Sequence, residues 1–236
     1  MKIGLDWSGV IANVHEARRL VLMEMHGAFE DGEKPKGSYR GNINIRPFSD
    51  EYRKMMSMIY FGRAPIFTFT KVWALADKST REEGSLLSIT EEDYEAMKVV
   101  LYERPEYALN IPAIDGALDA IRTLSEEGHD VEIVTSRGPD GIPRKVVADW
   151  LLANMVDLPV RYGVKDKTQV LHEYDFFVDD KKRQLAPEDL SLNTIRILFA
   201  HHYNMEDTEA FVSGPRGRVG YCVDWSSILR MVRNAA

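Results

Sequence analysis

The sequence predicts an α/β protein, in which a parallel sheet is covered by helices and a helical segment is inserted after the first strand. Three observations lead to this prediction. The chain begins with a short apolar run that ends on an acid, Asp6. Residues 14–105 show helical spacing and little strand pattern. After residue 105, short apolar runs typical of buried strands alternate with amphipathic helical patterns.

The elements expected for the sheet follow one another in a regular order. The first strand covers residues 2–5, and a helix over 115–127 ends at Gly128, since glycine is common just after a helix. Because strands and helices alternate, we expect right-handed crossovers and a parallel sheet covered on both faces. The remaining elements are strands over 130–135, 175–179 and 194–199, and helices over 143–154 and 224–233, the last capped by Asp224.

The inserted segment is expected to be a helical cap. Apolar residues recur at helical spacing over 14–26, and residues 30–45 have the composition of a loop. Further helices are predicted over 50–61, 68–76 and 90–103, the last opening with three acids in its first turn. The expected domains are therefore an α/β core of residues 1–13 and 106–236 and a cap of residues 14–105, placed over Asp6.

Charge and cysteine content narrow the expected partners and setting. The chain of 236 residues has a formal net charge of −7, which argues against polymeric nucleic acid or an anionic membrane as partner. No stretch approaches the ~18 apolar residues of a membrane helix, and Asp6 interrupts the first apolar run too early for a signal peptide. The single cysteine, Cys222, cannot form an internal disulfide, so a cytoplasmic setting is expected. A homodimer is left open.

Four segments place reactive side chains at or near the ends of expected strands. Ligands of open α/β sheets bind at the carboxyl ends of strands, so these side chains are expected to meet there. A nucleophilic carboxylate, a hydroxyl, a cation and an acidic pair are the groups needed to handle a phosphoryl group on magnesium. The segments are Asp6 with Gly9, Thr135-Ser136, Lys165-Asp-Lys-Thr and Asp179-Asp180.

Each segment also has an ordinary structural interpretation. Asp6 alone would be a helix cap or an ordinary aspartate in a turn. Thr135-Ser136 would cap the next helix, a role compatible with phosphate binding. The pair Asp179-Asp180 would lie in a solvated turn, because three basic residues follow it. Lys165 and Lys167 compete for the role of the cation. The combination is more specific than any single segment, and it favours the phosphoryl site.

In this order the four segments resemble the haloacid dehalogenase superfamily, whose members use a carboxylate nucleophile at the end of the first strand. The resemblance covers the whole sheet domain and implies a Rossmann-like core with an inserted helical cap. Within the superfamily the chain is most similar to the 5'(3')-deoxyribonucleotidases. That likeness rests on Asp6-Trp-Ser-Gly-Val-Ile-Ala, Thr135-Ser136, Asp166-Lys-Thr and Val178-Asp-Asp, and continues in Ile197-Leu-Phe-Ala-His-His-Tyr-Asn and Val223-Asp-Trp-Ser-Ser-Ile.

The resemblance implies a role for each site residue. Asp6 would attack phosphorus and form an aspartyl-phosphate, and Lys167, matched by the Asp-Lys-Thr run, would offset the charge between Asp6 and the phosphoryl oxygens. The metal would be Mg²⁺, which prefers hard oxygen ligands. The metal ligands would be Asp6, the Ser8 backbone carbonyl and Asp179, with Asp180 close by, and the phosphate would be held by Thr135, Ser136 and Lys145.

Ser8 is the main departure from the family pattern. Phosphatases of the superfamily have an aspartate there, which protonates the leaving group and later activates water. A serine hydroxyl is not appreciably acidic at neutral pH, and losing general acid–base help costs about 10²–10⁴-fold in rate. Three functions remain: a slow or specialised Mg²⁺-dependent phosphohydrolase for a small phosphomonoester, a catalytically impaired phosphate- or nucleotide-binding protein, and a phosphonatase-like C–P hydrolase.

Two further features bear on these alternatives. Carbon–phosphorus cleavage needs a cap lysine as a Schiff base, and Lys54 is the candidate. The deoxyribonucleotidases have an aromatic residue just after the first motif to stack the nucleobase, whereas that place falls near Val14 here. The expected ligand is a small phosphorylated metabolite or a nucleotide, and this departure argues against strict nucleotide specificity.

Overall fold

The structure is a computed structural model, and it describes residues 1–14, 17, 18, 21, 101, 102, 105–138, 140–186, 193–201, 204 and 219–235. The chain divides into two compact units, Met1–Asn13 with Pro112–Ala236, and Val14–Ile111. The predicted helices over 50–61 and 68–76, and Lys54, lie outside the described residues. The assignment of residues 14–105 as a helical cap therefore stays a prediction.

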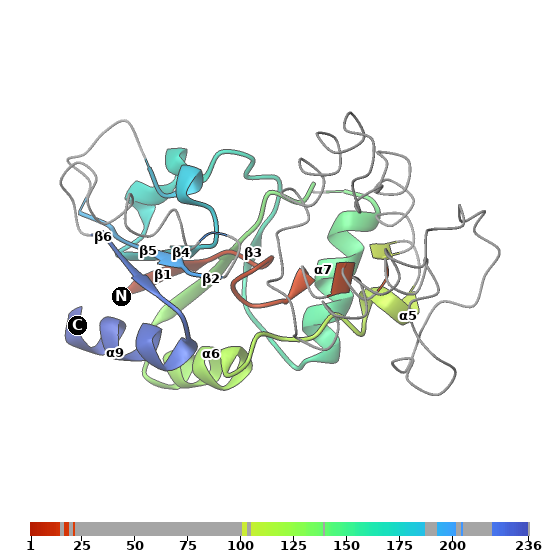
Figure 1. Ribbon diagram of the computed structural model, residues 1–236, viewed down its shortest axis with the longest axis horizontal. Helices are drawn as coiled ribbons and strands as arrows, with labels where there is room; N and C mark the ends of the chain where they lie inside the picture. Colours follow the sequence, from red (N-terminus) through yellow and green to blue (C-terminus); the bar gives the residue numbers. More distant parts are fainter. Residues whose placement is uncertain are drawn as a thin grey trace, which may run out of the picture. The chain divides into compact units, whose positions relative to one another are not determined.

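Six parallel strands form one sheet within the described part of the first unit (Figure 1). Their order is β3-β2-β1-β4-β5-β6, and every neighbouring pair is parallel. This confirms the predicted α/β parallel sheet. The strands are β1 (Lys2–Leu5), β2 (Asp130–Val134), β3 (Val160–Arg161), β4 (Phe176–Asp179), β5 (Ile195–Phe199) and β6 (Val219–Cys222).

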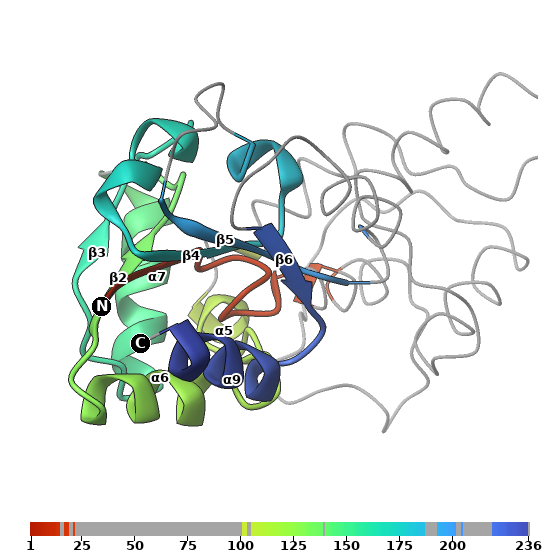
Figure 2. The same ribbon diagram turned by 90° about the vertical axis from the view of Figure 1, so that its left-hand side faces the viewer.

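The predicted helices of the core are also confirmed, as α6 (Ala117–Glu126), α7 (Ile142–Ala153) and α9 (Trp225–Ala235). Gly128 ends α6 in the left-handed region at φ 79°, where glycine carries no steric penalty. Asp224 caps α9, because its Oδ1 accepts a hydrogen bond from the Ser227 N–H at 2.7 Å. Helices α6 and α9 lie side by side on one face of the sheet, and three 3₁₀ turns lie on the other (Figures 1 and 2). The turns are η1 (Lys167–Gln169), η2 (Leu171–Glu173) and η3 (Lys182–Gln184).

Strand β1 lies between β2 and β4, and it is buried from Ile3 to Leu5. Gly4 permits close packing there, because a Cβ atom at this position would come within 2.4 Å of the Phe177 ring. The chain runs from β1 to β2 and β3 on one side, and then from β4 to β5 and β6 on the other. The order therefore reverses between β1 and β4, and their carboxyl ends are where an open α/β sheet binds ligands.

The second unit is described at fewer positions. Val14, Ala17, Arg18 and Val21 are helical, as predicted for residues 14–26. The Arg18 Nη2 atom donates a hydrogen bond to the Tyr102 hydroxyl at 3.1 Å, so these two segments of the unit are in contact. The short helix α5 (Pro105–Ala108) follows.

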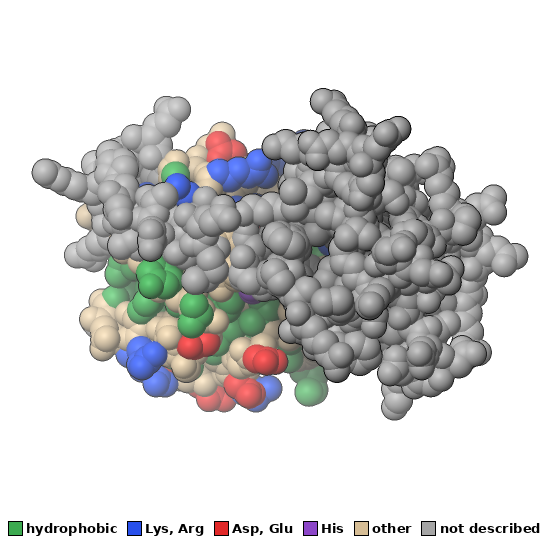
Figure 3. All heavy atoms as spheres, viewed as in Figure 1, with side chains coloured by type: hydrophobic (Ala, Val, Ile, Leu, Met, Phe, Trp, Pro, Cys, Tyr) green, Lys and Arg blue, Asp and Glu red, His purple; other side chains and the backbone are tan. Residues whose placement is uncertain are grey.

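The surface of the described part carries charges of both signs. On the face seen in Figure 3, Lys and Arg side chains lie among Asp and Glu side chains rather than in a stripe of one charge. Among the described helices, none combines the length and the apolar character needed to cross a membrane.

Candidate active site

Asp6 is placed at the carboxyl edge of the sheet by a tight loop. Its N–H continues the pairing of β1 with β4, donating to the Val178 carbonyl at 2.9 Å. The chain then turns sharply, because the N–H groups of Ile11 and Ala12 both donate to the Trp7 carbonyl, at 3.2 and 2.8 Å. Gly9 supplies the positive φ of 88° that the turn requires. Ser8 lies half-buried inside this loop, next to Asp6.

Two side chains from the end of the core sequence hold this loop in place. His201 Nε2 lies 2.6 Å from the Gly9 carbonyl oxygen, and Trp225 Nε1 donates to the Val10 carbonyl at 2.9 Å. Both residues belong to the two late segments of the predicted likeness to the deoxyribonucleotidases, and that likeness stays a prediction. Their contacts assign them a structural task, which is to fix the loop that carries Asp6 and Ser8.

The acidic pair lies where β4 ends. Asp179 is the last residue of β4, and its Oδ1 accepts a hydrogen bond from the Lys181 N–H at 2.8 Å. Asn204 Nδ2 donates to the Asp180 carbonyl at 2.7 Å and to the Phe199 carbonyl at 3.0 Å. These bonds tie the end of β4 to the end of β5, so the two carboxylates are held on a rigid edge.

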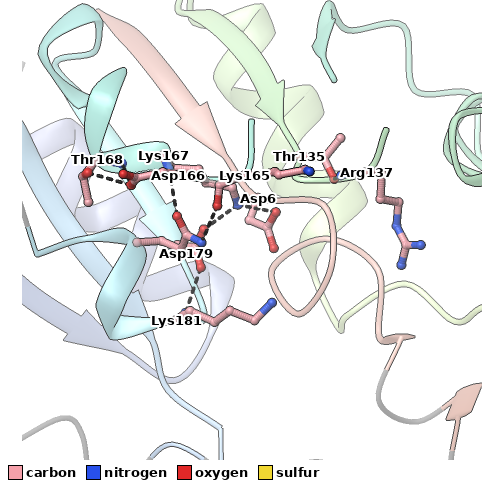
Figure 4. Close-up of polar contacts among 10 residues, drawn as sticks. Asp6, Thr135, Arg137, Lys165, Asp166, Lys167, Thr168, Asp179 and Lys181 are labelled. Carbon is pink, nitrogen blue, oxygen red and sulfur yellow. Dashed lines mark hydrogen bonds and ion pairs between the residues drawn. The ribbon is translucent and has the colours of Figure 1, made fainter. Parts of the chain in front are cut away.

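Lys167 reaches the carboxylates from the first residue of η1. Its Nζ donates to Asp6 Oδ1 and, at 2.5 Å, to Asp179 Oδ2 (Figure 4). Asp166 caps the turn by accepting from the Thr168 N–H at 3.1 Å. Lys165 is exposed. The structure therefore brings Lys167, rather than Lys165, between the two carboxylates.

Asp6, Lys167, Asp179 and Asp180 form a buried group that we call the acidic cluster. Their exposed fractions are 3%, 2%, 0% and 2%, and the three acids offer carboxylate oxygens within 4.8 Å of one another. Three carboxylates and one ammonium carry a formal charge of −2, which is costly in a buried site. Hard oxygen ligands at this spacing suit a divalent cation of the magnesium type, which would neutralise the cluster.

Burial and the neighbouring charges shift the pKa values of Asp179 and Lys167. Burial raises the pKa of Asp179 to about 7, and the negative charges of Asp6 and Asp180 add to this rise against the opposing effect of Lys167. Burial lowers the pKa of Lys167, but the charges and hydrogen bonds of Asp179 and Asp6 outweigh it and hold the pKa above its usual value. Burial therefore outweighs the contact with Lys167 at Asp179, whereas the two carboxylates outweigh burial at Lys167.

The predicted phosphate-binding residues lie in different surroundings. Thr135 follows β2 and is buried, and its N–H donates to the Arg161 carbonyl at 3.0 Å, whereas Ser136 is exposed. Figure 4 shows Thr135 and Asp179 on either side of Asp6, as expected for neighbours of β1. Lys145 is exposed on α7, where it forms an ion pair with Asp149 one turn further along. Within the described residues, no contact joins Lys145 to the acidic cluster, so its phosphate contact stays a prediction.

Two residues of the site were missed by the sequence analysis. Gln184 is buried and bonds to the segment that carries Lys167. Arg137 places its guanidinium carbon 4.7 Å from the centre of the Trp7 ring, beside the loop of Asp6. A glutamine after three basic residues gives no periodic signal. The Arg137 position was visible only as the end of the run Thr135-Ser-Arg.

No protein-family model matches this sequence, and no curated protein matches it. Solved structures of haloacid dehalogenase-type (HAD) proteins are nevertheless similar in fold. A HAD family hydrolase from Deinococcus radiodurans R1, crystallised with bound phosphate and sodium, is 12% identical with a TM-score of 0.54, covering 99% of this chain and 95% of that chain. A predicted phosphoglycolate phosphatase from Haemophilus somnus 129pt is 15% identical with a TM-score of 0.52, covering 98% and 97%. The six-stranded parallel sheet of the described residues, with its flanking helices, thus has the Rossmann-like fold of these two solved structures.

Proposed function

We propose that this chain is a magnesium-dependent phosphohydrolase that acts on a small phosphomonoester through an aspartyl-phosphate on Asp6. The main support is the buried acidic cluster, in which Lys167 contacts both Asp6 and Asp179. The fold adds support, because the similar HAD hydrolase from Deinococcus radiodurans holds phosphate. The order reversal between β1 and β4 also puts the acidic cluster where α/β sheets bind ligands.

The residues of the acidic cluster fit a bound Mg²⁺. Asp6, Asp179 and the backbone carbonyl of Ser8 would hold the ion, with Asp180 close by. The fit rests on hard oxygen donors and on the formal charge of −2, which one divalent ion balances. When bound, the ion would supply positive charge that orients the phosphoryl group and stabilises its oxygens during transfer.

The proposed reaction has two steps. In the first, a carboxylate oxygen of Asp6 attacks phosphorus, and the bond from phosphorus to the alcohol oxygen breaks as the new bond forms. Lys167 offsets negative charge between Asp6 and the phosphoryl oxygens, while Thr135, Ser136 and Lys145 hold the phosphate. In the second, water attacks phosphorus, and Asp6 and inorganic phosphate are released.

Ser8 limits both steps of this reaction. The departing alkoxide needs a proton, and the attacking water has to lose one. A serine hydroxyl can donate a hydrogen bond but does not act as an acid or base near neutral pH. The alcohol must therefore leave with help from solvent or from the substrate itself. We propose a slow or specialised activity for this reason, with esters of acidic alcohols reacting fastest.

The proposed substrate is a small phosphorylated metabolite or a nucleotide. The likeness to the deoxyribonucleotidases favours a nucleotide, and the missing aromatic residue near Val14 favours a smaller metabolite. A helical cap of residues 14–105 would close over the substrate and exclude water. A cytoplasmic setting is the accompanying prediction from the single cysteine, and a homodimer is left open.

A panel of phosphorylated metabolites and nucleotides with Mg²⁺ tests the proposal. We expect phosphate release by the wild type, its loss in Asp6→Asn, and a gain of up to about 10²–10⁴-fold in Ser8→Asp. Ser226→Asp, the same change at an exposed position of α9, is the matched control and should leave the rate unchanged.

Three results would contradict the proposal. Release that survives Asp6→Asn would exclude Asp6 as nucleophile. Binding of Mg²⁺ and phosphate without turnover by the wild type or Ser8→Asp would favour the impaired binding protein. Borohydride trapping of a lysine imine with phosphonoacetaldehyde would favour C–P cleavage.

A further inference from the structure

Gln184 joins two segments that contribute to the acidic cluster. It is the last residue of η3, which follows the acidic pair at the end of β4. Its side chain crosses to the segment before η1, which carries Lys167. Gln184 is 7% exposed, and it is a polar residue that the reaction proposed above does not use.

Both ends of the Gln184 amide are used in this contact. Its Oε1 accepts a hydrogen bond from the Lys167 N–H at 2.8 Å, and its Nε2 donates to the Lys165 carbonyl at 3.0 Å. A side chain that is both donor and acceptor fixes the peptide groups on the two sides of Asp166. The backbone of Lys167 therefore cannot shift without breaking a buried hydrogen bond.

These contacts close a circuit that begins and ends on one carboxylate. Asp179 Oδ1 accepts from the Lys181 N–H at 2.8 Å, and the Gln184 N–H donates to the Lys181 carbonyl at 2.9 Å. The Gln184 side chain holds the Lys167 backbone, and Lys167 Nζ donates to Asp179 Oδ2 at 2.5 Å. The circuit fixes the origin of the lysine side chain relative to the carboxylate that it contacts.

We infer that Gln184 is a positioning residue, which sets the ammonium of Lys167 between the nucleophile Asp6 and the carboxylate of Asp179. A lysine side chain is a flexible four-carbon stem, so its backbone origin decides where the charge lies. The Asp166 cap bonds to Thr168 on the exposed side of the turn and leaves the Lys167 N–H to Gln184. The importance of this position for catalysis rests on the function proposed for Lys167.

The first test is the kinetics of Gln184→Met, which keeps the volume of the side chain and removes both hydrogen bonds. We expect kcat to fall about 10–100-fold, because displacements of about 1 Å have costs of this size. KM should stay within about twofold, because Lys167 would act on the charge that develops in the transition state. Arg183→Met, at the exposed neighbour in the same turn, should change neither constant.

The second test needs no turnover. Carbamylation by cyanate, followed by mass spectrometry, measures the reactivity of each lysine in the Mg²⁺-free protein. Lys167 should react slowly in the wild type because it is buried between two carboxylates. In Gln184→Met its rate should rise about tenfold through local opening, while exposed Lys145 reports an unchanged rate in the same sample.

The outcomes separate this inference from the proposed function. Faster carbamylation of Lys167 together with lower kcat and unchanged KM supports the inference. Unchanged carbamylation overturns it whatever the kinetics show, and so does faster carbamylation with unchanged kcat. If Lys167 is carbamylated faster in Gln184→Met but the wild type hydrolyses no ester, the proposed function is rejected. The positioning of Lys167 by Gln184 is then still supported. If Gln184→Met is unfolded at the assay temperature, Gln184→Asn, which is too short to reach both partners, replaces it with the same criteria.

Discussion

Two groups of charged side chains in the core unit differ in their charge balance and in their exposure. The acidic cluster at the ends of β1 and β4 is buried and carries a formal charge of −2. The second group, which we call the balanced cluster, has two cations and two acids. In this cluster Arg161 Nη1 and Nη2 donate hydrogen bonds to Glu173 Oε1 and Oε2 at 2.8 and 2.7 Å. The four side chains of the cluster are 15–33% exposed. The balanced cluster consists of Lys2, Glu132, Arg161 and Glu173.

The pKa values of one acid in each cluster, Glu173 and Asp179, are shifted in opposite directions. The hydrogen bond from Arg161 lowers the pKa of Glu173, so this acid is stabilised as an anion. Burial raises the pKa of Asp179 despite the contact with Lys167. The charges of the balanced cluster cancel one another, whereas the acidic cluster keeps a formal charge of −2 that a bound cation would offset. A buried acid with a raised pKa, such as Asp179, is typical of functional sites, and this contrast supports the function proposed for the acidic cluster.

The largest expected effect comes from Lys167→Met, which removes the cation of the acidic cluster. We expect the free energy of unfolding of the metal-free protein to fall by about 3–5 kcal/mol, because two buried carboxylates lose their partner. Urea unfolding measures this change. Lys145→Met, which breaks an exposed ion pair on α7, is the control and should cost at most about 1 kcal/mol. Equal losses in the two variants would show that burial does not distinguish the two lysines.

Added Mg²⁺ should stabilise the protein through the acidic cluster. At 100 times its dissociation constant, a ligand that binds only the folded state adds about 2.7 kcal/mol to the free energy of unfolding. Thermal unfolding with Mg²⁺ and with excess chelator measures the shift. We expect Asp179→Asn to lose this response and Glu173→Gln, in the balanced cluster, to keep it. A response that survives Asp179→Asn would place the ion elsewhere.

The smallest effect is a difference in pH dependence between the two clusters. The folded pKa of Asp179 lies above its ordinary value, so the metal-free folded state holds more protons, and stability should fall as the pH rises from about 4 to about 7. The folded pKa of Glu173 lies below its ordinary value, so its contribution should be lost as the pH falls through the acid range.

Unfolding by urea across this pH range measures both trends. Asp179→Asn should flatten the fall toward neutral pH. Glu173→Gln should cost at most about 1 kcal/mol near neutral pH and should lose its effect in acid, because an ion pair with this exposure is weak. Identical profiles for the two variants would remove the contrast between the clusters.

The elements with local signals could be predicted from the amino-acid pattern alone. β1, β2, β4 and β5 were visible as apolar runs, and Gly128 and Asp224 marked helix ends through their own backbone preferences. The edge strands β3 and β6 were missed. β3 has two residues, and β6 contains Gly220, so neither has enough pattern to stand out from a loop.

The candidate site was only partly determined in this way. The acids could be assigned to strand ends from the sequence, because a parallel sheet gathers its carboxyl ends at one edge. The Asp-Lys-Thr run already favoured Lys167 over Lys165, but only the folded chain showed that its ammonium contacts Asp6. The contacts of His201, Gln184 and Trp225 had no counterpart in the sequence pattern. Lys167 and Asp6 are 161 residues apart, and no local preference encodes a contact over that distance. Such contacts are decided by the order of the strands and by the packing of the turns between them.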